Sequence, residues 1–355
     1  MSRSILRGSS EALSGEVLRV LLGTGEPNIR DHATIAAFFE AAQRRHRHVF
    51  DRFLEVGMPI DLVNKEGKGI AAYAVKSGDP GWLDYVLSRE PDSERRRSLA
   101  NRKSRHVRNP PMVYAITDIV NSVPMIKKLK SLGANPHIGG HNGMNMLMFS
   151  AIYDNIEAAR YFLKAGVHPN ERSRSGDTAI MLAITNGSTK VFDLLLKAPN
   201  LRLGMQNERG ETEFVVAVRA ADARALQKLI ELADRIGKAR GIPDLPVRLL
   251  GQRDNNGDSA ATAAAKLGYY GIVEKISAAG ASITLKDRRA ILDYWERQER
   301  RALFAEPRDG EAYPQRTVER KARLRIGKML EIMVTGPGGT DRHGNAKQER
   351  RRIVA

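Results

Sequence analysis

Residues 166–200 read GVHPNERSRSGDTAIMLAITNGSTKVFDLLLKAPN. Two short apolar patterns occur in this stretch, Thr178–Ile184 and Lys190–Lys197, and the apolar residues of the second recur at the spacing of one helix face. Asn186-Gly187 separates the two patterns, and both residue types tolerate the left-handed conformation that ends a helix. The stretch therefore predicts two short helices joined by a tight turn.

The glycines show that this unit is repeated. Three pairs of glycines have the same ten-residue separation, and the second and third pairs are 33 residues apart: Gly57 and Gly67, Gly133 and Gly143, Gly166 and Gly176. Asn200 takes the place of Gly166 one unit further on, and it is the other residue type that suits a left-handed backbone position. A fixed period of this length is typical of repeat proteins.

The pattern resembles the ankyrin repeat, in which D-x-x-G-x-T-P-L-H opens a first helix and L-L-L-x-x-G-A ends a second. The matching segments here are Asp254–Ser259, Ser175–Thr178 and Leu194–Leu196. The Pro and His of T-P-L-H are absent from every unit, and Ala179 and Met181 replace them in the best one. The resemblance implies an all-α solenoid of helix-turn-helix units with hairpin loops. We expect about seven units, which start near residues 31, 64, 106, 140, 173, 207 and 254.

We divide the chain into four segments on this basis. Residues 1–30 are expected to form an N-terminal cap, residues 31–287 the repeat array, residues 288–335 C-terminal helices, and residues 336–355 a disordered basic tail. Two units are longer than the period, which predicts insertions near residues 90–111 and 237–250. Insertions in such arrays usually form loops, so we expect loops at both places.

Two amphipathic segments follow the array. Arg289–Phe304 is expected to be a helix that covers a neighbour with the apolar residues Ile291, Leu292, Trp295 and Phe304. Thr317–Thr335 is expected to be a second helix, and capping of the open end of the array is the main interpretation of both. The alternative is that the second helix docks into a larger assembly through an apolar face formed by Met329, Leu330 and Met333.

The chain is strongly basic, with 58 Lys and Arg against 41 Asp and Glu and a formal net charge of +17. Most of the excess lies outside the expected repeat core, because residues 92–110 have a net charge of +5 and residues 288–355 a net charge of +7. A basic surface attracts polyanions such as nucleic acid, acidic lipid or an acidic protein.

Residues 254–265 resemble the start of a calcium-binding loop. Asp254, Asn256 and Asp258 have the spacing of the first ligands, but Ser259 and Ala265 stand where such a loop needs Gly and Glu. We therefore interpret this segment as the turn of a repeat.

The sequence contains no enzymatic signature. The motifs of α/β-hydrolases, zinc proteases and kinases are absent, and Gly336–Gly339 lacks the Lys-Ser/Thr ending of a phosphate-binding loop. Zero Cys excludes disulfides and a Cys nucleophile. We expect no catalytic residue, no metal site and no cofactor, and a cytoplasmic protein without a transmembrane segment. Export to a host cell is compatible with the same sequence.

The resemblance implies that hairpin tips and inner helices bind other proteins. We expect a scaffold, an adaptor or a secreted bacterial effector that acts by binding a partner protein. The candidate partner-binding residues are the tip residues His137, Ile138, His141, Glu171, Arg172, Arg174, Gln206, Glu208, Arg209, Arg253 and Asn255.

The alternative hypothesis is a protein that binds nucleic acid or an acidic membrane through its basic insertion and tail. No aromatic residue interleaves with the basic clusters, which disfavours base stacking. The candidate polyanion-binding residues are Arg95, Arg96, Arg97, Arg102, Lys103, Arg105 and Arg108, to which Arg350–Arg352 in the tail and a third cluster, Arg44–His48, could add.

Overall fold

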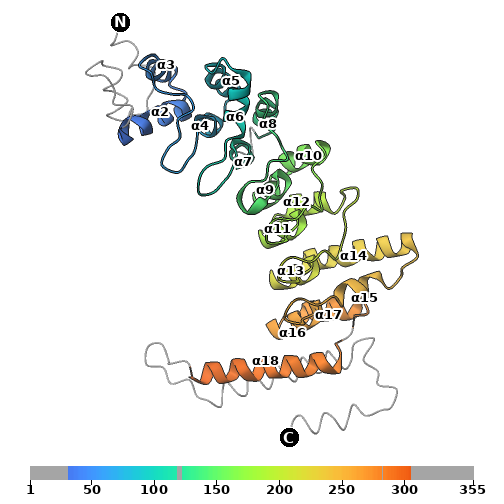
Figure 1. Cartoon of the computed structure of the whole chain (residues 1–355). Helices are drawn as coiled ribbons and strands as arrows, with labels where there is room; N and C mark the ends of the chain where they lie inside the picture. The colour runs from blue at the N-terminus through green and yellow to red at the C-terminus, as the bar shows by residue number, and fades with distance from the viewer. Residues whose placement is uncertain (1–30, 118–121, 282, 305–355) are drawn as a thin grey trace, which may run out of the picture. The chain divides into compact units, whose positions relative to one another are not determined.

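A computed structural model describes residues 31–117, 122–281 and 283–304 (Figure 1). The chain divides into two compact units, Met1–Arg174 and Ser175–Ala355, and each is described by itself. Within the described ranges the regular elements are helices, and the only β pairing is an isolated bridge between Val63 and Gly69. The predicted all-α fold is confirmed.

The described residues of the first unit contain four helix pairs. In each pair the first helix is called inner and the second outer. The inner helices are α2 (His32–Arg44), α4 (Ile70–Lys76), α7 (Pro111–Thr117) and α9 (Met146–Ile152). The outer helices are α3 (Arg47–Glu55), α5 (Pro80–Ser88), α8 (Ser122–Ser131) and α10 (Ile156–Lys164). Each inner helix packs against the next, and α5, α8 and α10 follow one another in a second row (Figure 1).

The second unit repeats this arrangement in three pairs. Its inner helices are α11 (Ala179–Thr185), α13 (Glu213–Arg219) and α16 (Ala260–Leu267), and its outer helices are α12 (Thr189–Leu195), α14 (Ala223–Arg240) and α17 (Tyr270–Ala278). Helix α13 packs against both α11 and α16. The described residues therefore contain seven helix pairs, the number that the sequence predicts.

The core lies between the two rows of helices and between neighbouring repeats. Residues 146–151 of α9 and residues 260–265 of α16 are all buried. A seven-residue helix that is apolar on every side cannot bury its surface against one partner. Stacking on the repeats before and after it therefore supplies the missing contacts.

The ends of the outer helices follow the sequence prediction. Gly166 after α10 has a φ of +87°, and Asn200 in the next unit has a φ of +64°. Both residues therefore reverse the chain in the left-handed conformation. Glycine adopts this conformation without strain, and Asn adopts it more readily than most other side chains do.

The two insertions contain helices, so the prediction of loops was wrong. The first contains α6 (Ser93–Asn101), where Asp92 caps the first turn by accepting from the N–H groups of Glu94 and Arg95, and where Leu99 is buried. The second lengthens α14 to 18 residues and adds α15 (Leu245–Leu250). Each insertion buries apolar residues, such as Leu99 in the first and Leu250 in the second. Their backbone N–H and C=O groups are buried with them, so these groups must form hydrogen bonds, and a helix provides them.

The helix predicted at Arg289–Phe304 is present as α18 (Leu285–Phe304), which begins four residues earlier than expected. It packs against α16, with Ile291 buried and Trp295 close to Gly268 at the end of α16. This is the position of a cap. The side chains of Leu292 and Phe304, the segments 1–30 and 336–355, and the helix expected at Thr317–Thr335 lie outside the described residues.

Candidate protein-binding surface

The hairpin turns that begin at Asn207 and Asp254 each pass through four residues, the first of which has a short polar side chain. In the turn that precedes α13, Asn207 Oδ1 accepts the N–H groups of Arg209 and Glu211 at 3.0 Å each. Asp254 makes the same two bonds, to Asn256 and Asp258, at 2.9 Å. The side chain replaces the missing backbone partners of the turn, and it thereby fixes the shape of the tip. We call the residues of each turn a hairpin tip.

Neighbouring tips are joined by backbone hydrogen bonds. In the first unit the N–H of Arg105 donates to the carbonyl of Glu66 at 2.9 Å, and the N–H of Arg174 donates to the carbonyl of Asn142 at 2.8 Å. In the second unit the same position supplies two further bonds, from Glu208 to Ser175 at 2.9 Å and from Asn255 to Arg209 at 3.0 Å. We call these bonds the tip ladder. It fixes the spacing of the tips that it joins, while the second and third tips of the first unit are joined by a bond from the N–H of His141 to Asn109 Oδ1 at 2.9 Å.

The tip ladder explains one of the repeated glycines. Gly210 has a φ of +72°, and a Cβ atom on it would lie 2.7 Å from the backbone nitrogen of Asn255. Two requirements therefore coincide at this position, a left-handed backbone and room for the next hairpin. Gly257, at the same place in the next tip, has a φ of +77° but nothing within 4 Å of such a Cβ.

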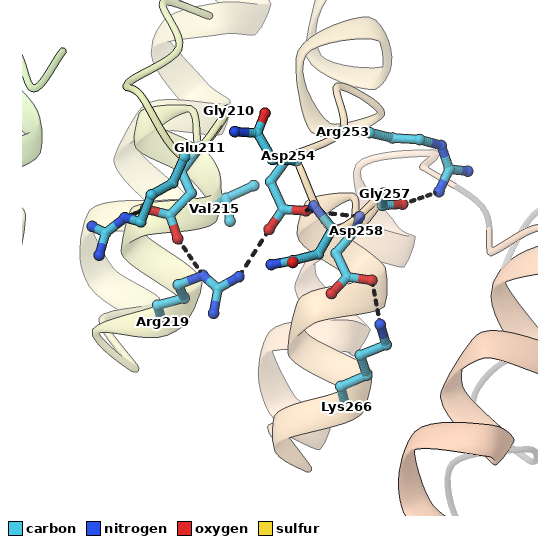
Figure 2. Close-up of polar contacts among 12 residues, drawn as sticks. Gly210, Glu211, Val215, Arg219, Arg253, Asp254, Gly257, Asp258 and Lys266 are labelled. Carbon is cyan, nitrogen blue, oxygen red and sulfur yellow. Dashed lines mark hydrogen bonds and ion pairs between the residues drawn. The ribbon is translucent and has the colours of Figure 1, made fainter. Parts of the chain in front are cut away.

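An ion network lies beneath the tips of the second unit (Figure 2). Arg219, from the last turn of α13, reaches Glu211 at 2.6 Å and Asp254 at 2.8 Å. Arg209 also pairs with Glu211, at 2.8 Å. The side chains of Glu211 and Asp254 are almost fully buried, so the guanidinium of Arg219 offsets most of the cost of burying two carboxylates.

The segment that resembles a calcium-binding loop belongs to this network. Asp254 closes the turn and accepts from Arg219, while Asp258 pairs with Lys266 of α16 at 2.5 Å (Figure 2). Both acids are therefore engaged by the repeat itself, which confirms the interpretation of residues 254–265 as the turn of a repeat.

The tip of the last repeat is tied to α18. Arg253 pairs with Asp287 at 2.7 Å, and Thr284 donates to the same carboxylate. Burial of Asp287 opposes ionisation, but these hydrogen bonds outweigh it and lower the pKa of Asp287 to about 2. Two other candidates also have internal partners, because Gln206 donates to the carbonyl of Arg253 and Asn255 to that of Glu208.

The candidate tip residues of both units are open to solvent, apart from Ile138. His137, His141, Glu171, Arg172 and Arg174 are exposed, and Ile138 is half-buried. Glu171 accepts from Asn145 at 2.8 Å. In the second unit Glu208 and Arg209 are exposed as well, and 74% of the Arg209 side chain is accessible despite its ion pair. Their role in partner binding stays a prediction.

The basic residues of the first insertion have different environments. Arg96 donates to the carbonyl of Glu90, and Arg102 donates to that of Asp61. Arg95 and Arg97 lie exposed on α6. The remaining three, Lys103, Arg105 and Arg108, are exposed at the hairpin tip that precedes α7. The predicted polyanion-binding residues thus fall into three groups: two on the surface of α6, two that bond to backbone carbonyls, and three at a hairpin tip.

The third basic cluster belongs to the first two helix pairs. Arg44 pairs with Glu40 on α2, and Arg45 pairs with Asp79 next to α5. Arg47 lies over the ring of Tyr85, with its guanidinium carbon 4.2 Å from the ring centre. These residues hold the helix pairs together.

Sequence analysis did not anticipate a group of aromatic and basic side chains on the inner helices of the first unit. Lys76 Nζ lies 5.6 Å from the ring centre of Tyr73 and 5.2 Å from that of Tyr114, and Lys68 Nζ lies 5.9 Å from Tyr114. We call these four residues the tyrosine–lysine cluster. Its signal in the sequence was Tyr-x-x-Lys at the end of one short helix, followed by a single Tyr in the next.

Glu213 was also missed. It is the first residue of α13, it is 1% exposed, and it accepts from the N–H of Gly204 at 2.6 Å. Burial raises its pKa to about 7, and the hydrogen bond from Gly204 opposes this change. The sequence signal was an acid at the place where the ankyrin pattern has Pro.

None of the described helices is long and apolar enough to cross a membrane.

The family comparison agrees with the repeat architecture. Residues 112–207 match the family model described as ankyrin repeats, in three copies. The human neurogenic locus notch homolog protein 4 is 31% identical over 88 residues, which cover 25% of this chain and 4% of that protein. A chain in a solved structure, described as a predatory endopeptidase from Bdellovibrio bacteriovorus in complex with an immunity protein, is 20% identical. Its TM-score is 0.46, over 55% of this chain and 96% of that one. Residues 112–207 therefore contain ankyrin repeats, and the described helix pairs and the tip ladder before and after this range have the same form.

Proposed function

We propose that the chain is a non-catalytic protein–protein interaction module that binds a partner protein through its hairpin tips and inner helices. Ankyrin repeats generally have this role, and residues 112–207 match them. The observation that carries the proposal is the tip ladder, because within each unit it presents exposed side chains of neighbouring repeats at fixed spacing. A pre-organised surface loses little conformational entropy when it binds.

Such a module acts by binding: it either localises its partner protein or blocks the partner's other interactions. We propose a scaffold, an adaptor or a secreted effector as the form of this activity. Binding would then depend on side chains that the fold itself does not need. Arg174 meets this condition, because its backbone holds the tip ladder while its side chain is exposed.

Affinity capture from a matched lysate tests the proposal. The full chain, treated with nuclease, is compared with the variant His141→Ala/Arg174→Ala at exposed tip positions and with Arg95→Ser/Arg97→Ser on α6. A defined protein partner that is retained after nuclease treatment, lost by the tip variant and kept by the α6 variant supports the module. Material that disappears with nuclease, or with the α6 substitutions alone, would contradict it.

The second of these outcomes would favour binding of a polyanion. Exposed Arg95 and Arg97 on α6, with Lys103 and Arg108 at the neighbouring tip, are the observation behind that alternative. Arg96 is left unchanged in the test because it donates to a backbone carbonyl at the end of α5.

A further inference from the structure

The second residue of each hairpin tip in the first unit is basic. Lys65 occupies this position in the first tip and His141 in the third, and Arg105 and Arg174 are identified by the bonds that they donate in the tip ladder. All four side chains are exposed. The corresponding residues of the second unit are Glu208 and Asn255, so the row of basic side chains belongs to the first unit alone. We call Lys65, Arg105, His141 and Arg174 the basic tip row.

Several cations on or next to the first helices of the same unit are already paired. Arg44, Arg45, Arg52 and Arg89 each pair with a carboxylate at 3.0–3.6 Å. By contrast, no described carboxylate lies within ion-pair distance of Lys65, Arg105 or Arg174. A cation that is exposed at a rigid position and has no acidic neighbour is available to an acidic ligand.

The tyrosine–lysine cluster continues this surface onto the inner helices. Lys68 follows directly after the first tip, while Tyr73 and Lys76 belong to α4 and Tyr114 to α7. Asn64 of the same tip donates to the hydroxyl of Tyr73 at 2.8 Å. The cluster is therefore continuous with the tips of the second and third repeats.

Lys76 is the cation of this cluster that lacks an acidic partner among the described residues. Glu66 bonds to Lys68 at 2.6 Å, whereas Lys76 contacts the two tyrosine rings. Burial and the charge of Lys68 lower the pKa of Lys76, and the charge of Glu66, which makes no ion pair with Lys76, opposes this shift only in part. A carboxylate placed beside Lys76 would relieve this cost, and half-exposed tyrosines are a side-chain type enriched in protein interfaces.

We propose that the first unit binds an extended, acidic segment of a partner protein along the basic tip row, with one acidic side chain received by Lys76 in the tyrosine–lysine cluster. This inference rests on the proposed function and specifies the chemistry of the partner. Val107, which is 46% exposed between Arg105 and Arg108, adds an apolar contact to the same tip.

The spacing of the basic tip row fits a polypeptide. Stacked helices lie about 8–10 Å apart, so successive repeats offer one basic tip at about that interval. An extended chain advances about 3.3 Å per residue, and an acid at every third residue would therefore match the row. A nucleic acid strand places a phosphate about every 3.4 Å along a duplex axis, a much denser pattern.

Fluorescence anisotropy with the full chain tests the inference. The probe is a labelled peptide of about 15 residues with Glu at every third position and Ser and Gly elsewhere, and single-stranded DNA of equal charge is the comparison. The tip variant is Lys76→Gln/Arg105→Gln/Arg174→Gln. The control is Lys130→Gln/Arg160→Gln/Lys164→Gln, which removes the same charge from exposed positions on outer helices of the same unit.

We expect the tip variant to weaken peptide binding by about tenfold or more and the control to change it by less than twofold. An equal loss of peptide affinity in both variants would show that only the net charge of the chain matters, and it would overturn the inference. DNA that binds as tightly as the peptide, and that depends on the same three residues, would also overturn it. Unchanged thermal unfolding of both variants shows that folding is not the cause.

The result separates this inference from the proposed function. If the tip-dependent protein partner is captured from lysate but the acidic peptide does not bind, the module stands and the chemistry assigned to its partner is wrong. If no protein partner is captured, the proposed function itself fails, whatever the peptide does.

Discussion

The hairpin tips of the two units have the same backbone bonds but use charge differently. In the second unit Arg219 and Arg253 pair with buried carboxylates of the tip or of α18. In the first unit Arg105 and Arg174 have no such partner among the described residues. The arginines of the second unit therefore join neighbouring elements through ion pairs, whereas those of the first unit are exposed to solvent.

The difference arises at the residue that follows the tip glycine. In the second unit this residue is Glu211 or Asp258, and both are buried and paired with a cation. In the first unit the same place has Lys68 or Met144. After Gly176 the same place has Asp177, which accepts from Asn207 and forms no ion pair with Arg174. An acid at this position is thus paired with a cation in the tips that begin at Asn207 and Asp254.

The largest expected effect compares one arginine from each unit. Replacing Arg219 with Ala leaves Glu211 and Asp254 buried without their shared guanidinium, which should lower the free energy of unfolding by about 3 kcal/mol. Arg105→Ala removes an exposed side chain and should cost about 0.5 kcal/mol or less. Urea unfolding of the two variants measures both values, and equal losses would contradict the comparison.

Substitutions at two equivalent glycines test how much the close approach of neighbouring tips contributes to stability. Gly210→Ala forces a left-handed alanine and brings its Cβ against the backbone of Asn255, so we expect a loss of about 2 kcal/mol. Gly257→Ala has only the backbone strain, because no atom lies near the new Cβ, and should cost about 1 kcal/mol. Equal losses by thermal or urea unfolding would show that the close approach of the hairpins adds nothing.

Glu213 gives the second unit a pH dependence of its own. Its pKa of about 7 in the folded protein exceeds the ordinary value of 4.5, so the folded state retains a proton that the unfolded state releases. Stability should therefore fall as pH rises from 4.5 to 7. Glu213→Gln should remove this loss and raise the free energy of unfolding at pH 8 by roughly 2 kcal/mol, with little change at pH 4.5.

The matched control for that variant is Glu274→Gln, an exposed acid on α17 of the same unit. Unfolding curves at pH 4.5 and 8 should be the same for this control and for the unmodified chain. A Glu213→Gln variant whose stability depends on pH as the unmodified chain does would contradict the assignment of the buried proton to Glu213.

The smallest expected effect concerns the contact with α18. The low pKa of Asp287 means that its bonds to Arg253 and Thr284 contribute stability above pH 3.8, and that this contribution is lost as pH falls towards 2. Asp287→Asn should therefore cost about 1 kcal/mol at pH 7 and almost nothing at pH 2. Glu171→Gln, at an exposed tip of the first unit, should cost less at pH 7. A pH-independent loss for Asp287→Asn would show that packing is responsible.

The repeat itself could be predicted from the sequence because it depends on local chemistry. Glycines at a fixed period and Asn200 in place of Gly166 specified the turns, and short apolar patterns specified the helices. The helices in the two insertions could not be predicted in this way. Only two of the nine residues of α6 are buried, Leu99 and Ala100, so the pattern is too weak to recognise without its neighbours.

The sequence predicted where the hairpin tips lie, but not which of their side chains are paired within the fold. Tip residues follow from the period, but whether a tip side chain is engaged depends on residues 30 or more positions away. Arg219 meets Asp254, and Arg253 meets Asp287, across neighbouring repeats. The tyrosine–lysine cluster likewise joins two inner helices, α4 and α7, whose stacking no local pattern reveals.

The tip ladder has a consequence for how the repeats open. The amide protons of Arg105, Arg174, Glu208 and Asn255 belong to exposed residues at a surface turn, where rapid exchange with solvent is the usual behaviour. Each is instead bonded to the preceding repeat, so its hydrogen exchange requires two neighbouring repeats to separate. The exchange rate of each of these four amides therefore measures how often the two repeats that it joins separate.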